Sequence, residues 1–101
     1  MLCVAHLDAD RVLIGVRLRY SADSSGIDFP LRTIVADALA LGTSGLILAH
    51  NHPSGDPRPS PADLASTRTL LTVARPLGLR LHDHLVFAGS RCVSLREAGL
   101  L

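Results

Sequence analysis

The sequence predicts an α/β domain in which a mixed sheet is flanked by helices. The chain has 101 residues and a mass of 10.7 kDa, which is the size of one small domain, so residues 1–101 are expected to share a single core. Hydrophobic residues make up 48% of the chain and charged residues 19%, a balance typical of globular proteins. Strand-like and helix-like patterns alternate in the order ββαβαββ, which is typical of sheets covered by helices.

A β-hairpin is predicted at the start of the chain. Leu2 to Leu7 and Val12 to Leu18 are aliphatic stretches separated by a short loop, residues 8–11. Alternate residues of the second stretch are apolar, and this apolar face is expected to be buried against a neighbouring element; the residues are Val12, Ile14, Val16 and Leu18. Ser21 to Gly26 is predicted to form a loop.

A helix and a buried strand are predicted next. From residue 31 the apolar residues recur at helical spacing, between Pro30 near the start and Gly42 at the position of a C-cap; they are Leu31, Ile34, Val35, Ala38, Leu39 and Leu41. Gly45 to Ala49 is an unbroken aliphatic run, which favours a central strand covered on both faces. His50 follows this run directly.

The second half is predicted to contain a stiff loop, a helix and two strands. Prolines in residues 51–60 fix backbone torsions and predict a rigid, irregular loop. Ser60 is a typical N-cap, and the helix that follows is predicted to run to about Arg75 with an inward face of Leu64, Thr67, Leu71 and Ala74. Leu79 to Phe87 and Arg91 to Ser94 are predicted to be strands.

The composition argues against nucleic acids and membranes as partners. The formal net charge is only +1, and the three aromatic residues are too few for a base-stacking surface, so direct DNA binding is not expected. No secretory signal is visible in the first residues and no apolar run approaches the roughly 20 residues that cross a bilayer, so a cytoplasmic protein is expected. Cys3 and Cys92 lie outside any CxxC pair and are expected to be half-buried thiols on strands, not a disulfide.

Two histidines and an aspartate have the spacing of a metal site. His50 and His52 are two residues apart at a strand end, so both side chains are expected to point to the same side. Asp63 follows eleven residues after His52, and the proline-rich loop is long enough to return it to the strand end. Zinc binds histidine nitrogens and carboxylate oxygens, and catalytic zinc sites commonly use three protein ligands.

Each of these residues also has an ordinary structural interpretation. Ser60 and Asp63 are typical of a helix N-terminus, and the two histidines could mark the point where a strand leaves the core. Taken together, their arrangement favours a metal site.

These residues resemble a known family. The run His50-Asn51-His52-Pro53-Ser54-Gly55-Asp56-Pro57, with Pro59-Ser60, Asp63 and Asp83-His84-Leu85, is similar to the JAB/MPN domain of the bacterial RadC family over nearly the whole chain. The resemblance implies a fold similar to that of cytidine deaminases and a JAMM motif in which His50, His52 and Asp63 bind zinc and Ser60 supports the oxyanion. It also implies kinship with metalloproteases that cleave isopeptide bonds to ubiquitin-like tails, and RadC proteins carry a DNA-repair label.

The chain departs from the family pattern in two ways. Active members use an upstream glutamate as general base, whereas the only glutamate here, Glu97, follows the motif, and Val16 and Arg17 stand near the expected position. A positioned base contributes about 10²- to 10⁴-fold in rate. A shifted strand register could instead supply a carboxylate from Asp8, Asp10 or Asp23. The family's N-terminal helix-hairpin-helix region is also not part of the sequence.

The leading hypothesis is a zinc-binding domain of the JAMM metallopeptidase type, which hydrolyses an amide or isopeptide bond if it is active. Asp83 and His84 either orient a metal ligand through a hydrogen bond or lie at a solvated edge of the sheet. The alternative is a non-catalytic module that recognises a peptide tail or a repair partner. A DNA-acting metallonuclease or a deaminase has little support, because the sequence lacks the CxxC pair of a deaminase zinc site, and His-Asn-His does not make a nuclease without its own ββ-metal framework.

Overall fold

The computed structural model describes residues 1–19 and 30–101, so the loop predicted at Ser21 to Gly26 lies outside the described residues. The elements follow the predicted order: β1 (Leu2–Leu7), β2 (Leu13–Arg19), α1 (Leu31–Leu41), β3 (Gly45–Asn51), α2 (Pro61–Ala74), a short 3-10 helix η1 (Arg75–Leu77), β4 (Arg80–Ala88) and β5 (Arg91–Ser94). The predicted α/β class is confirmed.

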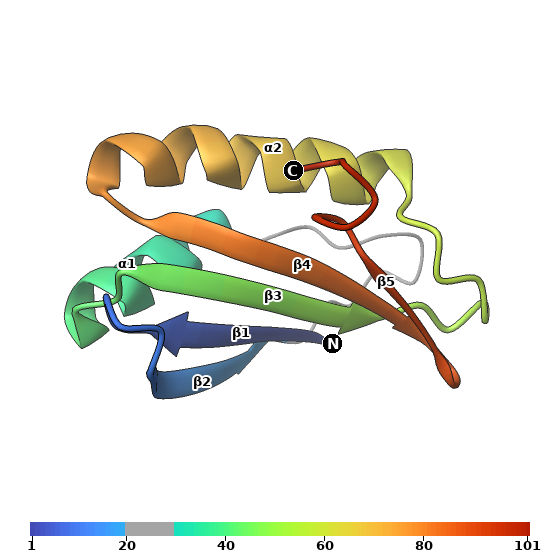
Figure 1. Ribbon diagram of the computed structural model, residues 1–101, viewed down its shortest axis with the longest axis horizontal. Helices are drawn as coiled ribbons and strands as arrows, with labels where there is room; N and C mark the ends of the chain where they lie inside the picture. Colours follow the sequence, from blue (N-terminus) through green and yellow to red (C-terminus); the bar gives the residue numbers. More distant parts are fainter. Residues whose placement is uncertain (20–29) are drawn as a thin grey trace.

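The five strands form one mixed sheet in the order β2-β1-β3-β4-β5 (Figure 1). β1 pairs antiparallel with both β2 and β3, β3 pairs parallel with β4, and β4 pairs antiparallel with β5. β3 is therefore the central strand, as predicted, and His50 lies near its carboxyl end.

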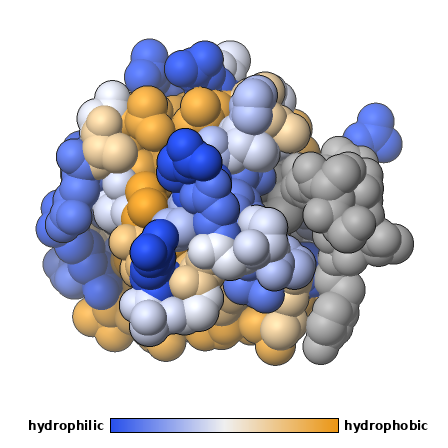
Figure 2. Space-filling model, turned by 90° about the vertical axis from the view of Figure 1, so that its right-hand side faces the viewer, coloured by the Kyte–Doolittle hydropathy of each residue, from blue (hydrophilic) through white to orange (hydrophobic). Residues whose placement is uncertain are grey.

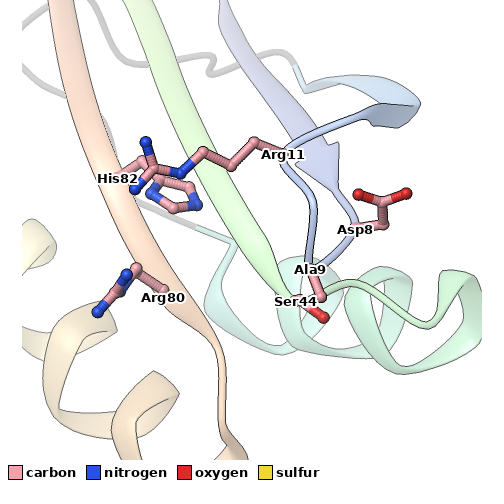
Figure 3. Close-up of a pocket in the computed structure, with 6 residues that line it drawn as sticks. All are labelled: Asp8, Ala9, Arg11, Ser44, Arg80 and His82. Carbon is pink, nitrogen blue, oxygen red and sulfur yellow. The ribbon is translucent and has the colours of Figure 1, made fainter.

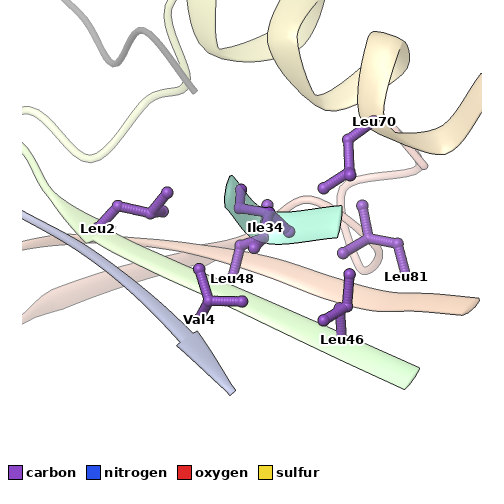
Figure 4. Packing of buried hydrophobic residues seen from close by; sticks show 7 residues of the cluster. All are labelled: Leu2, Val4, Ile34, Leu46, Leu48, Leu70 and Leu81. Atoms are coloured by element: carbon purple, nitrogen blue, oxygen red, sulfur yellow. The ribbon is translucent and has the colours of Figure 1, made fainter. Parts of the chain in front are cut away.

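The main core lies between one face of the sheet and the two helices. Its buried side chains come from β1, β3, β4 and both helices and pack into one cluster (Figure 4): Leu2, Val4, Ile34, Leu46, Leu48, Leu70 and Leu81. Alternate residues of each strand point to this face, so α1 and α2 bury their apolar sides against the same surface.

The expected burial of the apolar face of β2 is wrong. Val16 is 45% exposed and Leu18 is 50% exposed. The register of β2 on β1 places Arg17 opposite Val4, so the alternate residues of β2 that point toward the helices are Gly15, Arg17 and Arg19. The apolar residues of β2 point to the opposite face of the sheet, which no helix covers among the described residues. Hydrophobic atoms accordingly line the lower margin of the molecule in Figure 2.

The same arrangement corrects the expectation that β3 is covered on both faces. Ile47 and Ala49, which share the uncovered face, are only partly buried, whereas Leu46 and Leu48 are fully buried. Arg19 reaches across to form an ion pair with Asp37 of α1.

Helix α2 begins as predicted at Ser60 and Pro61 and ends one residue early, at Ala74. Its predicted inward face is partly wrong, because Leu70 is fully buried while Leu64 and Leu71 are only partly buried. The buried side of α2 consists of Asp63, Thr67, Leu70 and Ala74. Two polar residues therefore lie on the inward face of this helix, at the end nearest to His50.

Both cysteines are free. Cys3 is half-buried on β1 as expected, but Cys92 is exposed on β5, at the edge of the sheet. No helix among the described residues is long and apolar enough to span a membrane.

Candidate metal centre

His50, His52 and Asp63 converge at the carboxyl end of β3. The Nε2 atom of His50 lies 3.0 Å from Nε2 of His52 and 3.5 Å from Oδ1 of Asp63, and Nε2 of His52 lies 2.9 Å from Oδ2 of Asp63. His50 and Asp63 are buried, whereas the side chain of His52 is 17% exposed. The three side chains therefore form a buried group that reaches solvent on the His52 side.

The loop after β3 fixes the backbone of this group. The backbone N–H of His52 donates to the carbonyl of Phe87 on β4 (2.7 Å), so the chain continues beside β4 after β3 ends. The Gly55 N–H donates back to the carbonyl of His52 (3.2 Å), which closes a turn, and Gly55 has a left-handed φ of 82°. The chain then turns toward α2 and brings Asp63 to the histidines.

A backbone carbonyl orients His52. Nδ1 of His52 lies 2.8 Å from the carbonyl oxygen of Asp56. A carbonyl only accepts hydrogen bonds, so Nδ1 carries the hydrogen and donates it. Neutral His52 therefore presents the lone pair of Nε2 to Asp63 and His50.

A chain of hydrogen bonds orients His50. The hydroxyl of Thr67 donates to the carbonyl of Asp63 (2.7 Å), so Thr67 accepts from Nδ1 of His84 (2.8 Å). Neutral His84 then accepts at Nε2 from Nδ1 of His50 (2.7 Å). Burial, followed by the proximity of His50, lowers the pKa of His84 to about 4, which keeps it neutral at pH 7. Nε2 of His50 is left unprotonated and faces the other two side chains.

A capping box holds Asp63. Its backbone N–H donates to the Ser60 hydroxyl oxygen (3.0 Å), and its Oδ2 accepts from the Ser60 backbone N–H (2.8 Å). Burial alone would raise the pKa of Asp63, but the adjacent His50 and the hydrogen bond from the Ser60 N–H outweigh it and hold the pKa well below its usual range. The second oxygen, Oδ1, is buried without a hydrogen-bond partner. The carboxylate is therefore negative, immobilised and incompletely satisfied.

The donor set fits a divalent cation. Two imidazole lone pairs and a carboxylate face one another with no hydrogen available between them, an arrangement that is repulsive unless a cation joins them. Zinc ligands at 2.0–2.2 Å in a tetrahedron are about 3.3 Å apart, and the observed separations of 2.9 to 3.5 Å bracket that spacing. No other His, Cys, Asp or Glu of the described residues joins the group.

The remaining predicted site residues occupy different places. Ser60 lies beside Asp63 and uses its oxygen as the helix cap, which leaves its hydroxyl hydrogen free to donate. Asp83 points away from the group: its carboxylate accepts from the Ser94 hydroxyl (2.6 Å) and the backbone N–H groups of His84 and Arg96. Asp83 thus anchors the segment after β5, while His84 contacts His50 directly.

Two of the three aspartates considered as a general base, Asp8 and Asp10, lie at the opposite end of the sheet from His50. Asp8 and Asp10 lie in the loop after β1, and the antiparallel pairing of β1 and β3 sets Leu7 opposite Gly45 and Leu2 opposite His50. Asp23 lies outside the described residues. Glu97 is exposed in a turn after β5.

Thr67 and the carbonyl of Asp56 contact the histidines of this region, and the sequence does not predict either contact. The sequence predicts Thr67 on the inward face of α2, and because it follows Asp63 by four residues it lies on the same side of the helix. That spacing was a usable signal. The contact of the Asp56 carbonyl has no sequence signal, because every residue has a backbone carbonyl.

The comparisons with known proteins agree with this geometry. The model of the RadC-like JAB domain family matches residues 1–100. A UPF0758 protein of Rhodobacter capsulatus is 45% identical over 98 residues, and one of Ruegeria pomeroyi is 40% identical over 98 residues; each match covers 97% of this chain. A UPF0758 protein of Salinibacter ruber is 35% identical over 101 residues. The chain spans 46%, 44% and 42% of the lengths of these relatives.

Proposed function

The chain belongs to the RadC-like JAB domain family, and we propose that it is a zinc-binding domain whose metal centre is of the amide-hydrolase type. The observation that carries this proposal is the convergence of three acceptors, His50 Nε2, His52 Nε2 and the Asp63 carboxylate, without a hydrogen between them. When bound there, zinc would polarise a carbonyl and lower the pKa of water.

The residues of the chain would act around that ion in defined ways. His50 and His52 would bind through Nε2. The hydrogen bonds from their Nδ1 atoms to His84 and to the Asp56 carbonyl fix the tautomer of each imidazole. Ser60 can donate its hydroxyl hydrogen to the oxygen of a substrate carbonyl, because its own oxygen is fixed by the helix cap. The partly exposed side of His52 is where a peptide or protein tail would approach.

The experiment is metal analysis of the purified chain after incubation with zinc and removal of unbound metal. One zinc per chain is expected in the wild type and little in His52→Ala or Asp63→Asn. His82→Ala removes a histidine outside the centre and should retain the ion. A wild-type chain without zinc, or variants that retain it, would overturn the proposal.

A second candidate is a binding module that retains the metal but does not hydrolyse its ligand. The observation in its favour is that no further carboxylate joins the group among residues 1–19 and 30–101. Leu2 of β1 pairs with Arg19 on one side and with His50 on the other, so these three side chains lie on the same face of the sheet. Arg19→Glu would therefore place a carboxylate on the face that carries His50. Turnover of isopeptide-linked substrates by the wild type favours the hydrolase. Zinc-dependent peptide binding without turnover, or turnover only by Arg19→Glu, favours the module.

A further inference from the structure

A second group of polar side chains lies at the opposite end of the sheet from the candidate metal centre. It surrounds a cavity of about 230 Å³ between the β1–β2 loop and the starts of β3 and β4 (Figure 3); the lining residues are Asp8, Ala9, Arg11, Ser44, Arg80 and His82. Gly45, next to this cavity, and His50 stand five residues apart on β3, which is about 17 Å along a strand. The cavity is therefore separate from the candidate metal centre.

The β1–β2 loop holds Arg11 in an unusual conformation. Arg11 has a φ of 64°, and it is the only non-glycine residue with a positive φ in the described part of the chain. The loop enforces it: one oxygen of the Asp8 carboxylate accepts from the N–H groups of Asp10 (2.8 Å) and Val12 (2.9 Å), and the Arg11 N–H donates to the Asp8 carbonyl (3.0 Å). Such strain persists where the surrounding structure imposes it, and it is common at ligand sites.

The result is that the side chain of Arg11 extends across β3 toward His82 (Figure 3). A β-bulge aims His82 at the same place, because Leu46 pairs with Leu81 and Ile47 pairs with Asp83, which leaves His82 without a partner in β3. The missing side chain of Gly45 makes room for the imidazole, since a Cβ there would lie 2.3 Å from Nε2 of His82.

The charges around the cavity are mainly positive and unpaired. Neither Arg11 nor Arg80 forms an ion pair with any carboxylate in residues 1–19 and 30–101. The carboxylate of Asp8 is engaged by its own loop and points away from the two guanidinium groups in Figure 3. Burial, and then the charges of Arg11 and Arg80, lower the pKa of His82, so the imidazole lies in a positive environment.

We infer that this cavity binds a phosphate-like oxyanion through Arg11, Arg80 and His82. Guanidinium groups donate in a planar fork that suits phosphate and carboxylate oxygens. Here the donors come from the β1–β2 loop and from β4, in more than one direction, which suits a tetrahedral oxyanion better than the two oxygens of one carboxylate. The group is either a free or terminal phosphate or a phosphodiester.

The test is a titration of the full chain with inorganic phosphate at constant ionic strength and pH, followed by amide NMR. We expect saturable shifts at Arg11, Ser44 and Gly45 in the millimolar range, and Arg11→Gln and Arg80→Gln should each weaken binding by about tenfold or more. Arg91→Gln removes the same charge at the start of β5, outside the cavity, and should change affinity by less than about twofold. Circular dichroism checks that the variants fold.

Two further arms separate the possible ligands and sites. Dimethyl phosphate tests the diester: binding of both probes supports a phosphodiester, and binding of inorganic phosphate alone supports a free or terminal phosphate. His52→Ala should retain the shifts at Ser44 and Gly45, because the cavity does not depend on the metal centre. Shifts that do not saturate, that map to other residues, or that Arg91→Gln reduces as much as Arg80→Gln would overturn the inference.

Discussion

Nε2 of His84 lies 2.7 Å from Nδ1 of His50, and both imidazoles are buried. This contact places the hydrogen of neutral His50 on Nδ1, because His84 donates from its own Nδ1 to Thr67 and can only accept at Nε2. Thr67 in turn donates to the carbonyl of Asp63. The candidate ligand on β3 is therefore linked through two side chains to the backbone of the candidate ligand on α2, so the two are positioned relative to each other.

The first prediction concerns Thr67. Thr67→Val removes the hydroxyl that fixes the hydrogen of His84, so His50 loses its preferred tautomer and zinc affinity should fall about 10- to 100-fold. Thr67→Ser retains the hydroxyl and should restore most of the affinity. Thr69→Val removes a similar hydroxyl from the exposed side of the same helix and is the matched control. Competition with a chromophoric chelator measures these affinities, and equal zinc binding by Thr67→Val and Thr69→Val would contradict the role of Thr67.

The second prediction concerns the pH dependence of stability without metal. The pKa of His84 is about 4 in the folded chain, lowered by burial and by His50, against 6.5 for an unperturbed histidine. Between these values the unfolded chain binds more protons, so the free energy of unfolding should decrease as the pH falls from 6.5 toward 4. The loss attributable to this group is about 3 kcal/mol. Asp63, whose pKa is also lowered, contributes its loss only at more acidic pH.

Urea denaturation in the presence of a chelator, from pH 7 to pH 4.5, measures this dependence. His84→Gln should show a shallower decrease than the wild type, because the titrating imidazole is gone. His6 is also buried with a lowered pKa and contributes in the same direction, so part of the slope should remain in the variant. Identical slopes in the two proteins would contradict the assignment to His84.

The order of elements and the ligand spacing could be predicted from the sequence because both depend on local patterns. The helical repeat before Gly42 and the Ser60-Pro61 start of α2 determine where the helices lie. The face of β2 that would be buried could not be predicted, since alternation shows only that two faces differ. In the structure, pairing with β1 directs Arg17 toward the helices and leaves Leu18 exposed.

The candidate site divides in the same way. His50, His52 and Asp63 follow from a motif with recognisable spacing, but the hydrogen-bond chain through Thr67 and His84 joins α2 to β4 across seventeen residues. Such contacts depend on how the helix packs on the sheet, which no local pattern specifies. Asp83 shows the converse: it stands next to His84 in sequence, yet β-strand alternation directs its side chain to Ser94 on the other face.

The third prediction tests the uncovered face of the sheet. Leu18→Thr should change the free energy of unfolding by less than about 0.5 kcal/mol, since Leu18 is 50% exposed. Leu48→Ala, on the covered face of the central strand, should cost about 2 to 5 kcal/mol. Chemical denaturation of the isolated chain measures both. A large loss in Leu18→Thr would mean that this face is buried in solution, for which self-association measured by analytical ultracentrifugation is the direct check.

The fourth prediction concerns Gly45, whose backbone lies against the imidazole of His82. A Cβ at this position would come within 2.3 Å of Nε2 and 2.6 Å of Cδ2 of that ring, a separation that requires the ring to move. Gly45→Ala should therefore destabilise the chain by about 1 to 3 kcal/mol, as overpacking does. His82→Ala removes the obstructing ring, so Gly45→Ala should be nearly neutral in that background, and the double-mutant cycle measures the coupling between the two residues. A cost of Gly45→Ala that is unchanged in the His82→Ala background would show that the glycine is needed for the β3 backbone itself, and His82 would then not owe its position beside the cavity to Gly45.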